Sequence, residues 1–166
     1  GLVIIFGHNL LPLIPFSEAS IIKSVLTPFF GATVIPLSAN TTFIMGYPPI
    51  PWFGIMLVGF AAGRFFEMDS EKRKSLFLKI GIGSLLFFVI LRFINIYGDS
   101  IPWSFQQNTI YTFLSFSNIT KYPPSLLFSL TTLGVMFLML AFAENAKNKF
   151  TDIAITYGRV PLFYFI

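Results

Sequence analysis

The sequence predicts an all-α protein, a polytopic bundle of transmembrane helices, and three observations lead to this prediction. Of the 166 residues, 55% are hydrophobic and only 11% are charged, whereas about 25% are charged in an ordinary soluble domain. The mean hydropathy is +0.77. The apolar residues do not alternate with polar ones but form continuous blocks, which is the pattern of segments that cross a bilayer.

The apolar blocks predict about five helices. A helix needs about 20 apolar residues to cross the hydrocarbon core. The three middle blocks approach or reach that length, and the first and last are cut short by the ends of the sequence. No linker divides them, so we expect one integral-membrane domain, residues 1–166, that is a fragment of a longer membrane domain. The blocks are residues 1–16, 50–66, 76–97, 123–142 and 154–166.

Two stretches between the blocks are harder to assign. Residues 25–45 are apolar, but Pro28, Pro36 and Asn40 interrupt them. Irregular backbone cannot lie exposed in lipid, so we expect a Pro-rich outer loop or a re-entrant segment there, and whether it spans the membrane stays open. Residues 104–117 are expected to form a short helix at the membrane interface.

Two short patterns concern how the helices begin and pack. The triplets Tyr47-Pro48-Pro49 and Tyr122-Pro123-Pro124 each precede an expected helix, and proline suits a first turn because its missing N–H would be unpaired there. Gly59 and Gly63 form a small-xxx-small pattern, which favours close packing of two helices.

Charge predicts the orientation of the bundle and excludes some functions. Basic residues cluster in two loops, around 64–79 and 147–149, so the positive-inside rule places these loops in the cytoplasm and the loop around Asp99 outside. The net charge of +4 forms no continuous basic patch, so no nucleic acid is expected as a partner. With no cysteine and one histidine, we expect neither a disulfide framework nor a metal site.

Polar groups within the apolar blocks are the candidate site residues. His8, followed by Asn9, is either a general base or relay, or a hydrogen-bonded bundle residue. Arg92 would cost at least ~2.5–3.5 kcal/mol at the bilayer centre without a partner. It either forms a structural pair with Asp99 or holds an anionic or sugar ligand.

A further polar face lies within the fourth apolar block. Ser125, Ser129 and Thr132 are spaced i, i+4 and i+7, so they share one face of a helix. That face either forms hydrogen bonds to a neighbouring helix or lines a polar cavity. Lys121 stands just before it.

Four motifs in order resemble one known family. They are YPPIPWFGIMLVGFAAG (47–63), LRFINIYGD (91–99), SNITKYPPSL (117–126) and YGRVPLFY (157–164). Together they resemble the bacterial branch of the heparan-alpha-glucosaminide N-acetyltransferase-like membrane family, over nearly the whole chain.

This resemblance implies an integral-membrane acyltransferase of the bacterial inner membrane. Such an enzyme passes an acyl group, typically acetyl, from acyl-CoA to a sugar amino or hydroxyl group on the outer or luminal side. The implied partners are membrane lipid, acyl-CoA as donor and a sugar or glycan acceptor; no cofactor is expected to stay bound, and a homo-oligomer stays open. The family's early Asp-x-x-Arg-Gly motif and early histidine are missing here, so the fragment alone is expected to be inactive.

The resemblance also assigns roles to the polar residues. His8 is the catalytic candidate, although it lies in a later His-Asn motif and is not equated with the family's early histidine. The expected substrate-binding residues are Asn9, Arg92, Asp99, Lys121, Ser125, Ser129 and Thr132. The alternative is a transporter or flippase half, or a structural membrane module, because broken helices with polar groups also suit a transport pathway.

Overall fold

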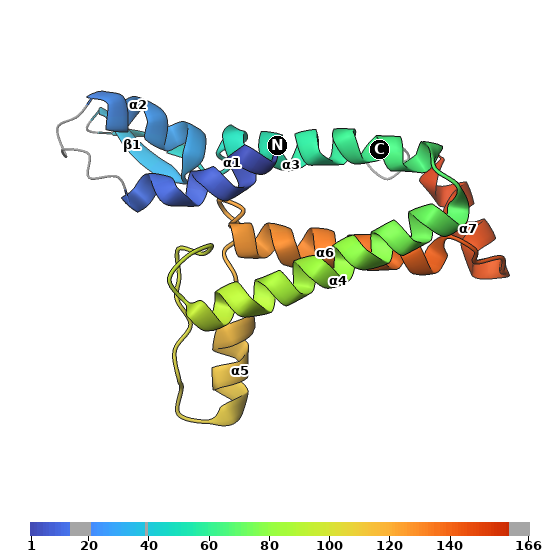
Figure 1. The fold of residues 1–166 in the computed structure, drawn as a ribbon. Helices are drawn as coiled ribbons and strands as arrows, with labels where there is room; N and C mark the ends of the chain where they lie inside the picture. Colours follow the sequence, from blue (N-terminus) through green and yellow to red (C-terminus); the bar gives the residue numbers. More distant parts are fainter. Residues whose placement is uncertain (14–20, 39, 160–166) are drawn as a thin grey trace.

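The protein is mostly helical (Figure 1). The computed structural model describes residues 1–13, 21–38 and 40–159. Within these ranges the chain forms seven α-helices, two 3₁₀-helices and one two-stranded sheet. The elements are α1 (Leu2–Gly7), η1 (His8–Leu13), α2 (Ile21–Phe30), β1 (Thr33–Ser38), β2 (Thr41–Met45), α3 (Pro49–Ala62), η2 (Gly63–Glu67), α4 (Ser70–Ile94), α5 (Thr109–Ser117), α6 (Leu126–Ala143) and α7 (Lys149–Gly158).

Three helices are long and apolar enough to cross a membrane. They are Pro49–Glu67, which joins α3 to η2, then Ser70–Ile94 (α4) and Leu126–Ala143 (α6). Each coincides with one of the three middle apolar blocks, so the prediction of helices there is confirmed. These three helices, α3 together with η2, α4 and α6, are therefore the candidate membrane spans of the described chain.

The first outer block forms a shorter α-helix than expected, and the last is described only in part. The first contains the six residues of α1 and then the 3₁₀-helix η1, and residues 14–16 lie outside the described ranges. At the other end α7 begins at Lys149, ahead of the expected start, because the Asn148 side chain caps it by accepting a hydrogen bond of 2.9 Å from the Thr151 N–H. Residues 160–166 lie outside the described part of the chain.

The stretch 25–45 corrects the prediction of an all-α protein. After α2 the chain forms an antiparallel hairpin in which Thr33 pairs with Met45 and Ile35 with Phe43. β-Branched and aromatic residues dominate both strands, and these residues favour extended backbone. The ten residues of α2 cover only about 15 Å, so the described part of this stretch holds no spanning helix. An exposed hairpin edge favours a place outside the hydrocarbon core.

The short amphipathic helix expected over 104–117 is confirmed only in its second half. α5 begins at Thr109 because Asn108 caps it, with its side-chain oxygen 2.9 Å from the Tyr111 N–H. Residues before Asn108 form a loop that turns back along the end of α4 (Figure 1).

The main packing contact joins α4 and α6, which lie side by side (Figure 1). A Cβ atom on Gly81 would lie 2.7 Å from the Leu138 side chain and 2.9 Å from the Gly134 carbonyl oxygen. A Cβ atom on Gly134 would lie 3.1 Å from Ser84. Glycine at both positions therefore lets the two backbones approach closely.

The glycine pattern singled out in the sequence is not used in this way. Neither Gly59 nor Gly63 has any atom within 4 Å of where a Cβ would stand, so the expected packing at this pattern is wrong for the described residues. α3 instead packs through Gly54, whose Cβ would lie 2.8 Å from the Ile4 side chain. The close contacts are thus α1 with α3 and α4 with α6.

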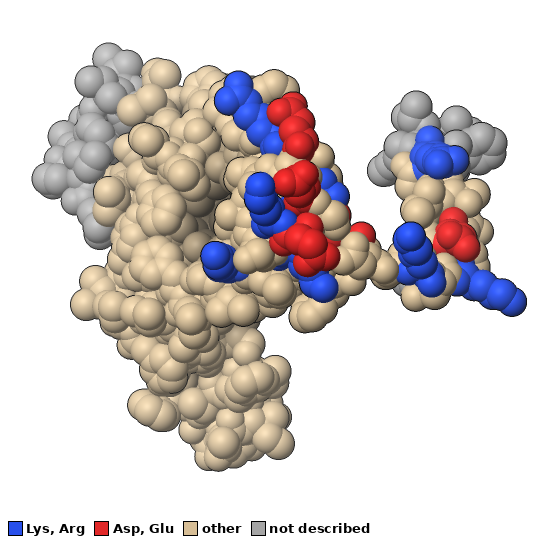
Figure 2. Space-filling model, turned by 45° about the vertical axis from the view of Figure 1, so that its right-hand side comes forward, with Lys and Arg blue, Asp and Glu red and all other residues tan. Residues whose placement is uncertain are grey.

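Charged side chains gather at one end of the bundle, which we call the α7 end, where α4 begins and α6 ends (Figure 2). Both basic loops lie at this end. The positive-inside prediction requires this arrangement, because it places both loops on the same side of the membrane. Asn145 joins the two loops by hydrogen bonds to Ser70 (3.1 Å) and Glu71 (3.2 Å). Which side of the membrane this end faces stays a prediction.

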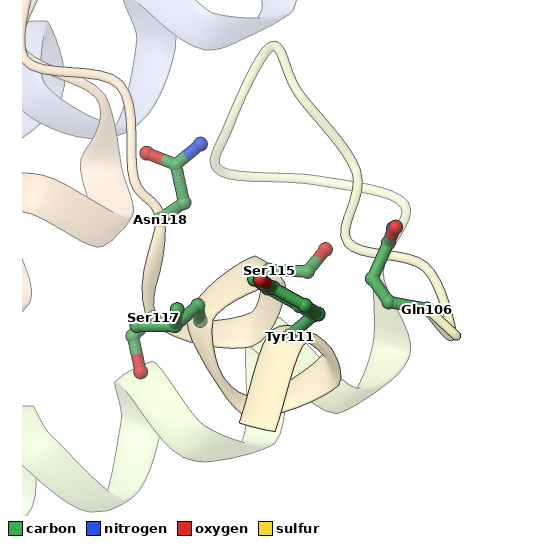
Figure 3. Close-up of a pocket in the computed structure, with 6 residues that line it drawn as sticks. Gln106, Tyr111, Ser115, Ser117 and Asn118 are labelled. Atoms are coloured by element: carbon green, nitrogen blue, oxygen red, sulfur yellow. The ribbon is translucent and has the colours of Figure 1, made fainter. Parts of the chain in front are cut away.

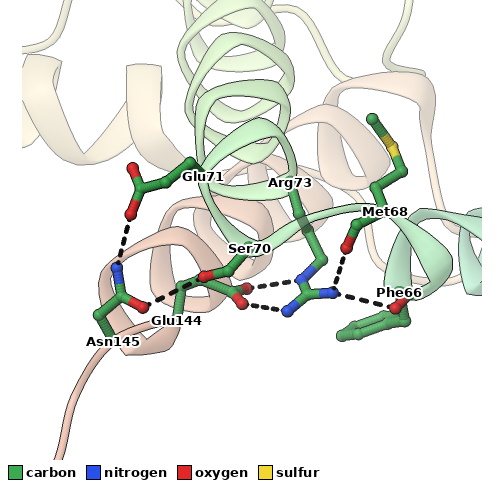
Figure 4. A network of polar contacts seen from close by, with 7 residues as sticks. All are labelled: Phe66, Met68, Ser70, Glu71, Arg73, Glu144 and Asn145. Atoms are coloured by element: carbon green, nitrogen blue, oxygen red, sulfur yellow. Dashed lines mark hydrogen bonds and ion pairs between the residues drawn. The ribbon is translucent and has the colours of Figure 1, made fainter.

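Arg73 holds the α7 end together (Figure 4). Its Nε donates to Glu144 at 2.8 Å, and its Nη2 pairs with the other carboxylate oxygen. Its Nη1 donates to the carbonyl oxygens of Phe66 (3.0 Å) and Met68 (2.9 Å). One guanidinium therefore ties η2 and α4 to the end of α6.

We predict that Gly81→Ala destabilises the helix pair and that Gly83→Ala does not. The added methyl at position 81 would collide with Leu138 and the Gly134 backbone, whereas a Cβ at position 83 has nothing within 4 Å. The expected loss for Gly81→Ala is about 1–3 kcal/mol, measured by unfolding in detergent. Equal stability of the two variants would contradict the packing described here.

We also predict that acid weakens the α7 end. The hydrogen bonds from Arg73 lower the pKa of Glu144, so the stability contributed by the pair is complete above the unfolded carboxyl pKa of about 4.3 and is lost as the pH falls through the folded value. Melting temperatures across this range should fall more steeply for the natural chain than for Glu144→Gln. The control Asp152→Asn, on exposed α7 surface, should keep the natural pH dependence; a loss of it there would point to a different carboxylate.

Candidate functional site

Arg92 organises the opposite end of the bundle, which we call the α5 end, where α4 ends and α6 begins. Its side chain is 1% exposed. Its Nε donates to the Phe116 carbonyl oxygen at 2.8 Å, and its Nη1 donates to Ile101 at 3.1 Å. Its Nη2 donates to the carbonyl oxygens of Ser115 (3.0 Å) and Asn118 (2.6 Å).

These four hydrogen bonds explain how a buried arginine is accommodated. The last carbonyl groups of a helix have no partner within it, and Arg92 satisfies those at the end of α5. A guanidinium has five N–H donors in a planar fork, so one side chain reaches α5 and two loops at once. Four of these five donors are occupied by backbone carbonyl oxygens, so little of the guanidinium is left for a ligand.

Asp99 is not the direct partner of Arg92. Among the described residues the two side chains form no ion pair, so the expected structural pair is replaced by the carbonyl contacts above. Asp99 instead accepts hydrogen bonds from the Thr120 N–H (2.9 Å) and hydroxyl (2.6 Å), the Ser125 hydroxyl (3.1 Å) and the Ile101 N–H (3.0 Å). It holds the loop after α4 against the segment before α6.

Asn95 is a structural residue that the sequence analysis missed. It ends α4 in the left-handed conformation, with φ 57°, which asparagine tolerates better than most residues. Its side chain donates to the Trp103 carbonyl oxygen at 2.8 Å and accepts from the Trp103 N–H at 3.0 Å. The indole N–H of Trp103 donates to the Arg92 carbonyl oxygen at 2.7 Å. An asparagine close to the end of an apolar block was the available signal.

His8 lies buried between α1 and the segment that leads into α6. Its Nδ1 is 2.9 Å from the Ile4 carbonyl oxygen and its Nε2 is 2.9 Å from the Pro124 carbonyl oxygen. The Asn9 side-chain nitrogen is 3.1 Å from His8 Nε2. A neutral imidazole has only one N–H to donate, so in that form it donates to one of these two carbonyls. The contacts fit a hydrogen-bonded bundle residue, one of the two interpretations left open for His8.

The serines and threonine of the polar face bond mainly to their own helix. The Ser129 hydroxyl donates to the Ser125 carbonyl oxygen at 3.1 Å, and the Thr132 hydroxyl donates to Phe128 at 2.8 Å. Ser125 caps α6, because its hydroxyl oxygen accepts from the Phe128 N–H at 3.0 Å. Neither a neighbouring helix nor a cavity is needed to satisfy Ser129 and Thr132, which differs from both expected arrangements.

The structure therefore brings together some of the predicted site residues and separates others. His8 bonds to Pro124, and the next residue, Ser125, bonds to Asp99. Asn9 contacts His8, and Ser129 lies one turn along α6. Lys121 and Thr132 are exposed and contact none of these side chains, and Arg92 is bound to backbone. The residues that converge are His8, Asn9, Asp99, Ser125 and Ser129.

A separate open hollow of about 620 Å³ lies beside α5 (Figure 3). None of the predicted site residues lines it. Among the described residues no cluster of three metal-binding side chains occurs. The hollow is lined by Gln106, Tyr111, Leu114, Ser115, Ser117 and Asn118.

Comparisons of the chain with protein-family models, with curated proteins and with solved structures find no match. The resemblance to the membrane acyltransferase family therefore rests on the four motifs alone, and most of the fourth motif lies outside the described residues.

We predict that Arg92→Met lowers the free energy of unfolding by about 3 kcal/mol, because it leaves four partly buried backbone carbonyl groups without donors. Arg92→Lys should restore less than half of the loss, since one ammonium cannot reach three segments. The exposed Arg64 provides the control, and Arg64→Met should change stability little. Unfolding in detergent measures all three; full rescue by lysine would show that charge alone matters at position 92.

Proposed function

We propose that this chain is part of an integral-membrane acyltransferase that transfers an acetyl group from acetyl-CoA to an amino or hydroxyl group of a sugar. The observation that carries the proposal is the convergence of an imidazole, a carboxylate and a hydroxyl at the α5 end, on the short segment before α6. His8 reaches this segment at Pro124 and Asp99 reaches it at Ser125. This segment lies within the third motif of the family resemblance.

Acyl transfer needs a group that takes the proton from the acceptor and groups that orient the reacting atoms. In the arrangement described, both ring nitrogens of His8 face carbonyl oxygens and Asp99 is surrounded by donors. These contacts suit positioning better than proton transfer. We therefore assign His8 and Asp99 to holding the segment before α6, and we expect the main proton-transfer group elsewhere in the whole enzyme.

The two substrates of the proposed reaction would lie on opposite sides of the membrane. The α5 end would face the outer or luminal side of a bacterial inner membrane, where the sugar or glycan acceptor lies, and acetyl-CoA would donate from the cytoplasm. Lys121, exposed at the α5 end, is the residue best placed to meet a free acceptor. No cofactor stays bound in this scheme, because the acyl donor is a substrate.

The proposal is tested by incubating the whole native protein with radiolabelled acetyl-CoA and a panel of amino sugars and simple hexoses. Label should pass to at least one sugar, and the 166-residue chain alone should transfer none. If the whole protein transfers no label but moves a sugar across the membrane of vesicles, the acyltransferase proposal is wrong and the transporter is favoured.

His8→Ala in the whole protein separates the two roles of the imidazole. Loss of a general base lowers the rate by about 10²–10⁴, and we expect a smaller effect because His8 bonds to backbone on both sides. His8→Gln, which keeps a side-chain donor toward Pro124, should recover part of the activity. A loss within the larger range that glutamine does not rescue would assign proton transfer to His8.

A further inference from the structure

The two Tyr-Pro-Pro triplets, far apart in the sequence, meet at the α5 end. The hydroxyl oxygens of Tyr47 and Tyr122 are 2.8 Å apart, and the ring centroids are 4.6 Å apart in an edge-to-face arrangement. The Trp52 ring lies beside both, with centroid distances of 6.4 Å to Tyr47 and 6.2 Å to Tyr122. The Lys121 ammonium lies 5.0 Å from the Tyr122 ring centroid. We call these four residues the aromatic corner.

The polar groups of the aromatic corner that have no partner are mainly hydrogen-bond donors. Where Tyr47 donates in the Tyr47–Tyr122 hydrogen bond, the proton of the Tyr122 hydroxyl is free for a ligand. The buried Trp52 indole N–H has no acceptor within the described part of the chain. Lys121 offers three N–H donors, and no described carboxylate forms an ion pair with it. A set of donors with one positive charge suits an anionic ligand that is rich in acceptors.

The Lys121 side chain is protonated at neutral pH. The neighbouring Tyr122 phenol raises the pKa of Lys121 above its ordinary value. The hydrogen bond with Tyr47, and then Lys121, lower the pKa of the Tyr122 phenol. Lys121 therefore remains an ammonium, and the Tyr122 hydroxyl is the more polarised of the two phenols.

The depth of the corner indicates which anion reaches it. Tyr47 stands two residues before α3 begins, and Tyr122 stands just before the Ser125 cap of α6. The 18 residues of α6 cover about 27 Å, close to the ~30 Å of the hydrocarbon core. The corner therefore lies at the level of the lipid headgroups, where tyrosine and tryptophan rings are favoured and where phosphate groups are concentrated.

We propose that the aromatic corner binds the phosphate of an anionic lipid headgroup, with Lys121 and the Tyr122 hydroxyl as its donors. A phosphate oxygen would accept a charge-assisted hydrogen bond from Lys121 and a second from the free phenol proton. This lipid site shares Lys121 with the acceptor contact proposed above, but it does not depend on acyl transfer, because none of its four residues takes part in the His8–Pro124–Ser125–Asp99 contacts.

The test measures lipid retained by the purified protein in a neutral detergent, by native mass spectrometry. Phosphatidylglycerol should bind saturably and more tightly than phosphatidylcholine. Lys121→Gln should weaken phosphatidylglycerol binding about tenfold by removing a charged donor, and Tyr122→Phe about threefold by removing a neutral one. Both side chains are on the surface, so neither change should prevent folding. Lys147→Gln removes an exposed charge at the α7 end and should change binding less than twofold.

Three outcomes would overturn the proposal. Equal binding of the two lipids would show that the net negative charge of the headgroup is not recognised, and equal losses in Lys121→Gln and Lys147→Gln would reduce the effect to the net charge of the protein. Tyr122→Phe with natural affinity would remove the phenol from the site. Glycerol 3-phosphate binding as tightly as the lipid would overturn the lipid assignment and leave a soluble phosphate ester as the ligand.

Discussion

The α5 end of the protein depends on the guanidinium of Arg92 and the four carbonyl oxygens around it. A buried charge is stable only when its donors are satisfied, and the carbonyls at the end of a helix are stable only when they find donors. Arg92 meets both requirements at once, because its donors meet the end of α5 and the loops on either side of it. Removing either partner would leave the other unsatisfied, so the loops and the helix form one unit.

α4 carries a similar arrangement at its other end. Arg73 binds the carbonyls of Phe66 and Met68 as well as Glu144, so each end of the helix holds a neighbouring loop through backbone acceptors. Arg92 follows Arg73 by 19 positions, which correspond to about 28 Å, and this is close to the thickness of the hydrocarbon core. Between them Gly81 meets Gly134 and brings α6 against the middle of α4. The helix is thus held at both ends and at its centre.

The parts of the fold that follow from local properties were predictable. Three apolar blocks became α3, α4 and α6, because the length of an apolar run and its composition are read directly from the sequence. The partners of Arg92 were not predictable in this way, since a backbone carbonyl has no sequence signature and any residue could supply it. Asp99 was the nearest acidic residue in the sequence, but its lone pairs are taken by donors around Thr120 and Ser125. The hairpin after α2 was missed because Pro36 and Asn40 were taken to interrupt regular structure, whereas Pro36 lies within β1 and Asn40 lies between the two strands.

The glycines show that the packing partner of a helix is also not predictable from the sequence. Gly59 lies as far after Tyr47 as Gly134 lies after Tyr122, and each stands on a helix that begins behind a Tyr-Pro-Pro triplet. Only Gly134 is covered by a neighbouring helix in the described residues; Gly59 has open space where a side chain would stand. Equal position in a repeated pattern therefore does not give equal packing, because packing depends on whether a partner helix is present.

The candidate site follows the same rule: Ser129 and Thr132 share one face, yet each hydroxyl is satisfied by its own helix. A polar face becomes a binding surface only when its groups are left without partners. Among the described residues of the α5 end, the Trp52 indole N–H has no acceptor and Lys121 has no ion-pair partner, whereas the serines of α6 are satisfied.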